Sequence, residues 1–252
     1  MAALGEVVSY LDELLGVAGF ADYCPNGLQV EGRTQLQRLV SGVTASQALI
    51  DVALAERADA ILVHHGYFWK GEDPCVTGMK QRRLRTLLQA EISLLAYHLP
   101  LDAHPVYGNN AQLARVLGLQ VLGSFGSGPA GGLALYGELS EALEPASLLA
   151  YLGHRLAQMP LHLPGPQPRI QRLGWCTGAA QAYLTDAATL GLDAYLSGEV
   201  SERTTHEARE LGIHYFAAGH HATERYGVQA LGAHLGAHFG LWQRFIDIPN
   251  PV

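Results

Sequence analysis

The chain has 252 residues, enough for one large domain or two small ones with a sizeable core. Apolar residues make up 48% and charged residues 15%, a globular composition that excludes a disordered or collagen-like protein. Acidic residues outnumber basic ones by 23 to 16, which gives a net charge of −7. The sequence contains no long basic block, and this argues against phosphate-dominated binding to a nucleic acid.

The cysteines and the N-terminus indicate the compartment. Cys24, Cys75 and Cys176 are widely separated and form neither a CxxC motif nor a disulfide framework. The N-terminal residues contain acids and no uninterrupted apolar core, unlike a signal peptide. No stretch approaches the roughly 20 apolar residues that cross a bilayer. We therefore expect a protein of the reducing cytoplasm that has no membrane partner.

The first half of the chain alternates predicted helices and strands. Apolar residues at i, i+3, i+4 and i+7 predict an amphipathic helix over residues 3–16. Apolar runs predict buried strands at 38–43, 60–63 and 92–97. Further helices are predicted at 46–58, 79–90 and 111–118, the last with Asn109 or Asn110 as its N-cap. Turn residues predict loops at 24–32, 71–78 and 100–110.

The second half follows a Gly-, Pro- and Ser-rich segment at 124–132, a candidate domain boundary. Strands are predicted at 133–139, 172–176, 193–199 and 213–219. Helices are predicted at 145–158, 177–191, 201–212 and from 220 to about 238. Turns are predicted at 162–168 and at the C-terminal end. The alternation predicts two interlocked α/β domains with mostly parallel or mixed sheets flanked by helices. The first would comprise residues 1–124 and about 213–252, the second about 125–212.

Histidines follow three of the predicted strands. They are His64 and His65, then His98, and finally His220 and His221. Ligands of open α/β sheets bind beyond the carboxyl ends of the strands, so these histidines would converge if the strands share one sheet. Two acids have compatible positions: Asp102 lies in the loop after His98, and Glu224 is at i+4 from His220 at a helix start.

Imidazole and carboxylate groups together are typical ligands of zinc, iron and manganese. Side chains of adjacent residues such as His64 and His65 diverge, so they would serve two ions more easily than one. This favours a dinuclear site at the carboxyl ends of the strands. The plainer interpretation is that a strand-terminal histidine is structural, and that an i, i+4 pair is an ordinary feature of a helix.

Four motifs carry a resemblance to a known family: YCPNGLQVEG, ILVHHGYFWKG, YHLPLDAHPVYGNNAQLARVLGL and DAYLSGEVSERTTHEARELGIHYFAAGHHATERYGVQAL. In this order they resemble the NIF-three-like family, many members of which are labelled GTP cyclohydrolase I type-two homologue. The resemblance covers nearly the whole chain and is weakest at 125–170. It implies a two-domain α/β fold, a toroidal homohexamer and two divalent metal ions per subunit. The implied ligands are His64, His65, Asp102, His220 and Glu224, with His98 close to the metals.

Two functions fit these expectations. One is a metal-dependent hydrolase of a small molecule, with GTP cyclohydrolase chemistry suggested by the resemblance. A metal-activated water would attack the substrate while His98 or His221 moves protons near neutral pH. The other is a non-enzymatic, oligomeric metal-binding protein that stores or delivers ions or serves as a scaffold. Arg225 is the only charged candidate for a substrate contact beside the ligands.

Three further features stay open. Tyr67, Phe68 and Trp69 could stack a planar substrate beside the metals, or pack in a core or an interface. The glycine turn at 177–183 could bind an anion at a helix start, although it matches neither nucleotide-binding glycine motif. Glu199 could line the same cavity or cap the helix that follows.

Overall fold

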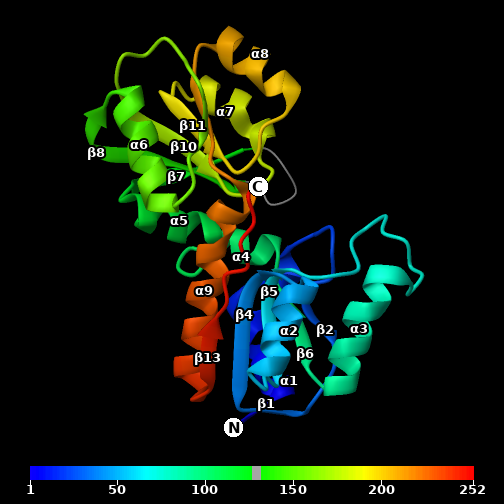
Figure 1. The fold of residues 1–252 in the computed structure, drawn as a ribbon. Helices are drawn as coiled ribbons and strands as arrows, with labels where there is room; N and C mark the ends of the chain where they lie inside the picture. The colour runs from blue at the N-terminus through cyan, green and yellow to red at the C-terminus, as the bar shows by residue number, and fades with distance from the viewer. Residues whose placement is uncertain (127–131) are drawn as a thin grey trace. The chain divides into compact units, whose positions relative to one another are not determined.

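The computed structural model describes residues 1–126 and 132–252. Its chain forms two compact units (Figure 1). Unit 1 comprises Met1–Gly108 and Gly227–Pro249, and unit 2 comprises Asn109–Tyr226 and Asn250–Val252. The long helix α9 (His220–Phe239) contains the boundary, so its first residues belong to unit 2 and the remainder to unit 1.

Unit 1 is built on a five-stranded sheet of order β13-β4-β5-β6-β2. β13, β4, β5 and β6 run parallel, and β2 pairs antiparallel with β6 at one edge. The strands are β2 (Gly27–Val30), β4 (Arg38–Thr44), β5 (Ala60–His65), β6 (Ser93–Ala96) and β13 (Trp242–Phe245). A separate two-stranded sheet pairs β1 (Ala2–Ala3) with β3 (Gln35–Leu36).

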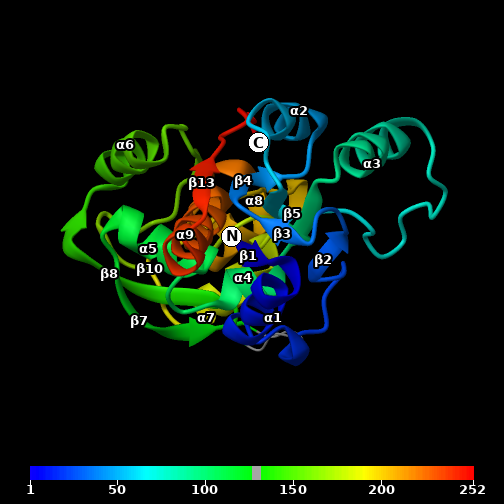
Figure 2. The ribbon, with the colours of Figure 1, turned by 90° about the horizontal axis from the view of Figure 1, so that it is seen from below.

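Helices cover both faces of this sheet. Apolar residues of α1 and α9 pack on one face, and those of α2 and α3 pack on the other, where Figures 1 and 2 show the latter two helices side by side. The strands supply both cores because successive side chains point to opposite faces: Leu39 faces the first core and Val40 the second. The helices are α1 (Leu4–Leu14), α2 (Gln47–Ala55), α3 (Gly78–Ala90) and α4 (Leu99–Ala103), with a 3₁₀ turn at Val17–Gly19.

Unit 2 is built on a six-stranded mixed sheet of order β7-β8-β10-β11-β12-β9. The central strands β10, β11 and β12 are parallel, and the outer pairings are antiparallel. The strands are β7 (Gln120–Phe125), β8 (Ala134–Leu143), β9 (Leu161–Leu163), β10 (Ile170–Cys176), β11 (Ala194–Ser197) and β12 (His214–Ala217).

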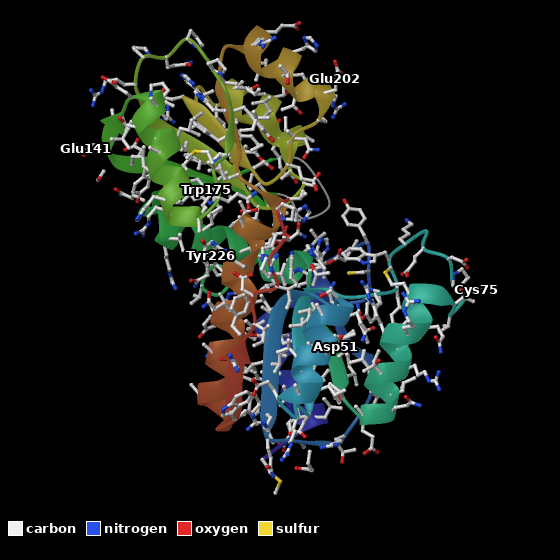
Figure 3. All side chains as sticks on the ribbon, viewed as in Figure 1. Asp51, Cys75, Glu141, Trp175, Glu202 and Tyr226 are labelled. Carbon is white, nitrogen blue, oxygen red and sulfur yellow. The ribbon has the colours of Figure 1, made fainter. Side chains whose placement is uncertain are left out.

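Two pairs of helices enclose the sheet of unit 2. α5 (Asn109–Leu117) and α6 (Pro145–Leu156) pack on one face, and α7 (Leu184–Thr189) and α8 (Glu202–Leu211) pack on the other. A 3₁₀ turn at Gln181–Tyr183 precedes α7. Trp175, labelled in Figure 3, is fully buried in the first of these cores, and its indole nitrogen donates to the Asn110 carbonyl at 3.0 Å.

The α/β class and the flanked, mixed sheets predicted from the sequence are confirmed. Four elements lie where only loops or turns were predicted: β2, α4, β9 and β13. Helix α5 begins at Asn109, one or two residues before the predicted start. Part of the predicted boundary at 124–132 lies outside the described residues. No helix in the described part of the chain is long and apolar enough to cross a membrane.

The division of the chain differs from the predicted domain bounds of 1–124 with 213–252 and of 125–212. α5 and β7 belong to unit 2, because β7 pairs with β8 and α5 packs on the same sheet. β12 also belongs to unit 2, where it lies between β11 and β9.

Candidate metal centre

Three histidines cluster at the carboxyl ends of two adjacent parallel strands in unit 1. His64 and His65 are the last residues of β5, and His98 follows β6. The ring centroid of His64 lies 4.5 Å from that of His65 and 5.0 Å from that of His98. Each ring offers a nitrogen within 4.8 Å of the nitrogens of the other two. The expected divergence of the His64 and His65 side chains is therefore wrong, because both rings turn toward His98.

A second partner fixes the ring of each clustered histidine. His64, which is fully buried, donates from Nδ1 to the Tyr97 carbonyl at 2.9 Å. A carbonyl oxygen can only accept, so Nδ1 carries the proton of this contact, and Nε2 is the nitrogen that could coordinate a metal ion. The Nδ1 atom of His98 lies 2.8 Å from Asp22 Oδ1, and that of His65 lies 3.2 Å from the Thr44 hydroxyl. Such outer partners are typical of metal-binding histidines.

Asp102 joins this cluster from helix α4. Pro100 stands in the first turn of that helix, where its missing N–H is not needed, and this explains a helix in a segment that reads as a loop. The Asp102 side chain is only 7% exposed, and its Oδ1 lies 3.5 Å from His64 Nε2. The first half of the predicted ligand set thus lies together within unit 1.

Asp22 is a residue that the sequence analysis missed. Its carboxylate accepts hydrogen bonds from His98 Nδ1, from the Asn26 side chain and from the backbone N–H groups of Tyr23 and Leu99. Burial raises the pKa of Asp22, but these hydrogen bonds outweigh it and lower that pKa to about 2. Its only sequence signal is its position directly before the motif YCPNGLQVEG.

Unit 2 carries a second group of ligand-type side chains, where its three parallel strands end. The Gly178 carbonyl, just past β10, accepts the N–H groups of Gly198 and Glu199, which follow β11. Gly219, which follows β12, donates its N–H to the Gly198 carbonyl at 3.0 Å. These bonds tie the three strand ends together and bring Glu199 beside the first turn of α9.

His220 in that turn lies between two carboxylates. Its Nδ1 is 2.7 Å from Glu199 Oε1, and its Nε2 is 2.9 Å from Glu224 Oε2. Burial lowers the pKa of His220, but hydrogen bonds and charge attraction from Glu224 and Glu199 raise it overall to about 9. The predicted i, i+4 pair of His220 and Glu224 therefore exists as a contact, and Glu224 is nearly buried.

Gly178 shapes the space beside this pair. Its φ is +67°, a left-handed conformation that favours glycine. A Cβ atom on it would stand 2.1 Å from Glu224 Oε1 and 3.2 Å from His220 Nε2. The backbone thus approaches the two side chains as closely as a glycine permits. Imidazole nitrogens and carboxylate oxygens held in this way fit a divalent transition metal or zinc.

The premise that the histidine-terminated strands share one sheet is wrong. β5 and β6 are neighbours in the sheet of unit 1, whereas β12 lies in the sheet of unit 2. His64, His65, His98 and Asp102 come together within one unit, and His220 and Glu224 within the other. His221 is buried, and its backbone N–H donates to the Val252 carbonyl at 2.9 Å.

The aromatic residues after His65 divide into separate roles. Tyr67 is buried in the core and donates its hydroxyl to the Ala45 carbonyl at 2.6 Å. The Trp69 ring lies edge-on to His98, with centroids 5.0 Å apart, and 6.0 Å from His65. Phe68 is 38% exposed and has a φ of +64°. Trp69 therefore borders the histidine cluster, while Tyr67 packs in the core.

In the anion site considered at residues 177–183, three of the N–H groups are engaged within the protein. Those of Thr177, Gly178 and Ala180 donate to the side chains of Asn110, Thr223 and Ser197. The histidines on the later turns of α9 are also accounted for by packing. His234 bonds to the hydroxyl groups of Tyr10 and Tyr107 and stacks on both rings.

Fold and site together define an α/β protein with potential metal ligands at the ends of parallel strands. The profile of the family Duf34/NIF3 (NGG1p interacting factor 3) matches residues 2–251. The chain therefore belongs to the Duf34/NIF3 family, as its motifs predicted.

Relatives match over their whole length. A Pseudomonas aeruginosa protein named GTP cyclohydrolase 1 type 2 homolog is 59% identical over 250 residues, which are 99% of each chain. A protein of the same name from Allochromatium vinosum is 57% identical over all of this chain and 98% of its own. Among solved structures, protein ybgI, described as of unknown function, is 49% identical with a TM-score of 0.96 and full coverage of both chains. A Thermus thermophilus protein is 36% identical with a TM-score of 0.90, again with full coverage.

Proposed function

We propose that the chain is a dinuclear metal-dependent hydrolase of a small molecule. Its ligands would be His64, His65 and Asp102 from unit 1 and His220 and Glu224 from unit 2. The observation that carries the proposal is the gathering, within each unit, of hydrogen-bonded imidazole rings with a carboxylate at the carboxyl ends of parallel strands, where α/β proteins bind their ligands. The label of the relatives, GTP cyclohydrolase 1 type 2 homolog, supports a hydrolytic reaction on a nucleotide-like substrate.

Each ligand has a defined task in this proposal. Bound divalent ions lower the pKa of water and polarise the bond that is cleaved. His64 binds through Nε2 while its Nδ1–H stays on the Tyr97 carbonyl. A carboxylate such as Glu224 has two oxygens and can serve both ions. His98, held by Asp22, and His221 are the candidates that move a proton to or from the substrate. Zinc, iron and manganese all suit this donor set.

A second function, a metal-storing or metal-delivering protein, is favoured by one observation. Arg225 was the only charged candidate for a substrate contact, and it donates to the Leu156 carbonyl at 2.6 Å and lies over the Tyr226 ring. It therefore contributes to packing within unit 2. The homohexamer implied by the family resemblance would suit either function, and sedimentation of the purified protein checks it.

Elemental analysis of protein purified without chelators tests the centre. We expect about two metal ions per chain, the number for a two-metal site. The variants His64→Ala and Glu224→Ala should hold fewer ions while keeping the circular dichroism of the parent protein. A content near zero that does not recover with Zn²⁺, Mn²⁺ or Fe²⁺ would contradict the metal centre, and unchanged content in both variants would contradict the ligand set.

A substrate screen separates the enzyme from the carrier. Metal-loaded protein is incubated with nucleotides, phosphoesters and cyclic amides, with the His65→Ala variant as the control. Turnover that disappears in the variant supports the hydrolase. Turnover that persists there comes from a contaminant, and no turnover with full metal occupancy favours the carrier.

A further inference from the structure

Glu199 is held against His220 by a single side-chain contact. Its Oε1 lies 2.7 Å from His220 Nδ1, and the other ring nitrogen of His220 faces Glu224. A carboxylate oxygen can only accept a hydrogen bond from an imidazole, unless it is itself protonated. The contact with Glu199 therefore places a proton on Nδ1, and the contact with Glu224 likewise places one on Nε2 in the metal-free protein. A metal ion at Nε2, beside Glu224, would replace that second proton and leave the Nδ1–H on Glu199.

The backbone of Glu199 is fixed on both sides. Its N–H donates to the Gly178 carbonyl at 3.2 Å, and its own carbonyl accepts the hydroxyl of Tyr215. The neighbouring Gly198 N–H donates to the same Gly178 carbonyl at 2.9 Å. The starting point of the Glu199 side chain thus depends on main-chain bonds that a substitution of the side chain would leave in place.

The alternative role of Glu199 as a helix cap is excluded by the start of α8. Ser201 is the N-cap residue of that helix, and it forms a reciprocal capping box with Thr204. Glu199 lies two residues earlier. Its carboxylate is therefore available for the histidine rather than for the helix terminus.

We propose that Glu199 is a positioning residue, which holds the Nδ1–H of His220 so that Nε2 is aimed at the metal ion. This inference rests on the proposed metal centre and adds a residue to it. A carboxylate behind a metal-binding imidazole fixes the tautomer and the ring orientation and makes the ring a stronger ligand. Glu199 touches neither metal nor substrate in this role; it acts through His220.

The same arrangement occurs in unit 1, where Asp22 lies 2.8 Å from His98 Nδ1. Asp22 also accepts bonds from the Asn26 side chain and from the N–H groups of Tyr23 and Leu99, so its removal would disturb the loop as well as the ring. The Glu199 side chain makes fewer hydrogen bonds to its surroundings than that of Asp22, so Glu199 is the better residue to test.

The experiment measures the Zn²⁺ affinity of the full chain by competition with a chromophoric chelator. Glu199→Ala should weaken the affinity by about 10- to 100-fold, the usual cost of losing such a partner. Glu199→Gln should lose less, because its amide oxygen still accepts the Nδ1–H but carries no charge. Glu202→Ala is the matched control. Glu202, labelled on α8 in Figure 3, is 87% exposed in its side chain and should bind Zn²⁺ as the parent does.

Two further measurements distinguish a positioning role of Glu199 from a purely structural one. The metal-free Glu199→Ala variant should still unfold cooperatively, with a somewhat lower midpoint than Glu202→Ala because its contact with His220 is lost. ¹⁵N spectra of the zinc-loaded parent should show the His220 proton on Nδ1. Equal Zn²⁺ affinity of the parent and Glu199→Ala would overturn the role of Glu199 alone. Failure of the parent chain to bind Zn²⁺, Mn²⁺ or Fe²⁺ would overturn the proposed metal centre and this role with it.

Discussion

In both units, oxygen atoms form hydrogen bonds with the Nδ1 atoms of histidines at the strand ends. The Tyr97 carbonyl, Asp22 and Glu199 hold the Nδ1 atoms of His64, His98 and His220. The sequence identifies these histidines because they follow apolar runs. It does not identify Asp22 or its link to His98, because a contact across 76 residues depends on how the loops close. The sequence position of Glu199 suits a cavity residue or a helix cap equally well, since sequence spacing carries no information about the direction of a side chain.

Gly178→Ala tests the approach of the backbone to His220 and Glu224. The new Cβ would stand 2.1 Å from Glu224 Oε1, so Glu224 must move, and we expect the variant to lose metal affinity measurably. The left-handed φ adds a loss of stability of about 1–2 kcal/mol. Gly191→Ala is the control, because its φ is +66° but no atom lies within 4 Å of the added Cβ. Titration with Zn²⁺ and urea unfolding of both variants give the comparison. Equal Zn²⁺ affinity of Gly178→Ala and Gly191→Ala would contradict the close approach of the backbone to a metal-binding pair.

Long, strongly periodic elements were predictable from the sequence, and short edge elements were not. The helices α1, α2, α3 and α6 and the strands β4, β5 and β10 lie within a few residues of their predicted bounds. In contrast, β2, β9 and β13 have three or four residues each and lie at sheet edges. Such strands exist because a neighbouring strand offers hydrogen bonds, and their own residues include the turn-forming and polar types that predict loops.

Helix α9 packs closely against the sheet of unit 1 through a glycine. A Cβ on Gly232 would stand 2.7 Å from Ser41 Oγ, which also accepts a hydrogen bond from Gln243 at 2.8 Å. Gly232→Ala should therefore destabilise the protein by about 1–3 kcal/mol despite the better helix propensity of alanine. Gly5→Ala in α1 meets nothing within 4 Å and should be neutral or stabilising by up to about 1 kcal/mol. Urea unfolding measures both, and a stabilised Gly232→Ala would contradict the close packing.

The whole molecule combines two α/β units, and in each unit ligand-type side chains lie at the ends of parallel strands. The sequence predicted the α/β class, because strands and helices alternate throughout. It did not predict which strands share a sheet: β12 reads like β5 and β6 as a strand before a histidine, yet it pairs with β11 and β9. Strand pairing is set by packing between distant segments, and local periodicity does not encode it.

Acid should destabilise the metal-free protein as the pH falls from about 6.5 to about 5, the range in which an unperturbed histidine gains its proton. Burial, together with neighbouring histidines, lowers the pKa values of His104, His162 and His234 below 6.5. The unfolded chain therefore binds more protons than the folded one in this range, and stability falls as the pH falls. His220 acts in the opposite direction: its raised pKa of about 9 stabilises the fold as the pH falls, and most of that gain is complete by pH 6.5, so it changes little below that value.

Urea midpoints of chelator-treated protein across this range provide the measurement. His162→Gln should show a shallower decline than the parent, because one of the three contributions is removed. A parent protein that is equally stable at both ends of the range would show that the three histidines are protonated in the folded state as readily as in the unfolded one.

The spacing of residues along α9 sets a limit on how the chain length can vary there. His220, Glu224, Val228, Leu231 and Leu235 recur at intervals of three or four residues, so one stripe of the helix carries the ligand pair and then the buried apolar residues. One residue inserted between Glu224 and Val228 would rotate the ligand pair by about 100° relative to the apolar residues. The ligand pair and the core residues of this helix therefore lie on the same face. A change in its length is compatible with both only in steps that keep whole turns.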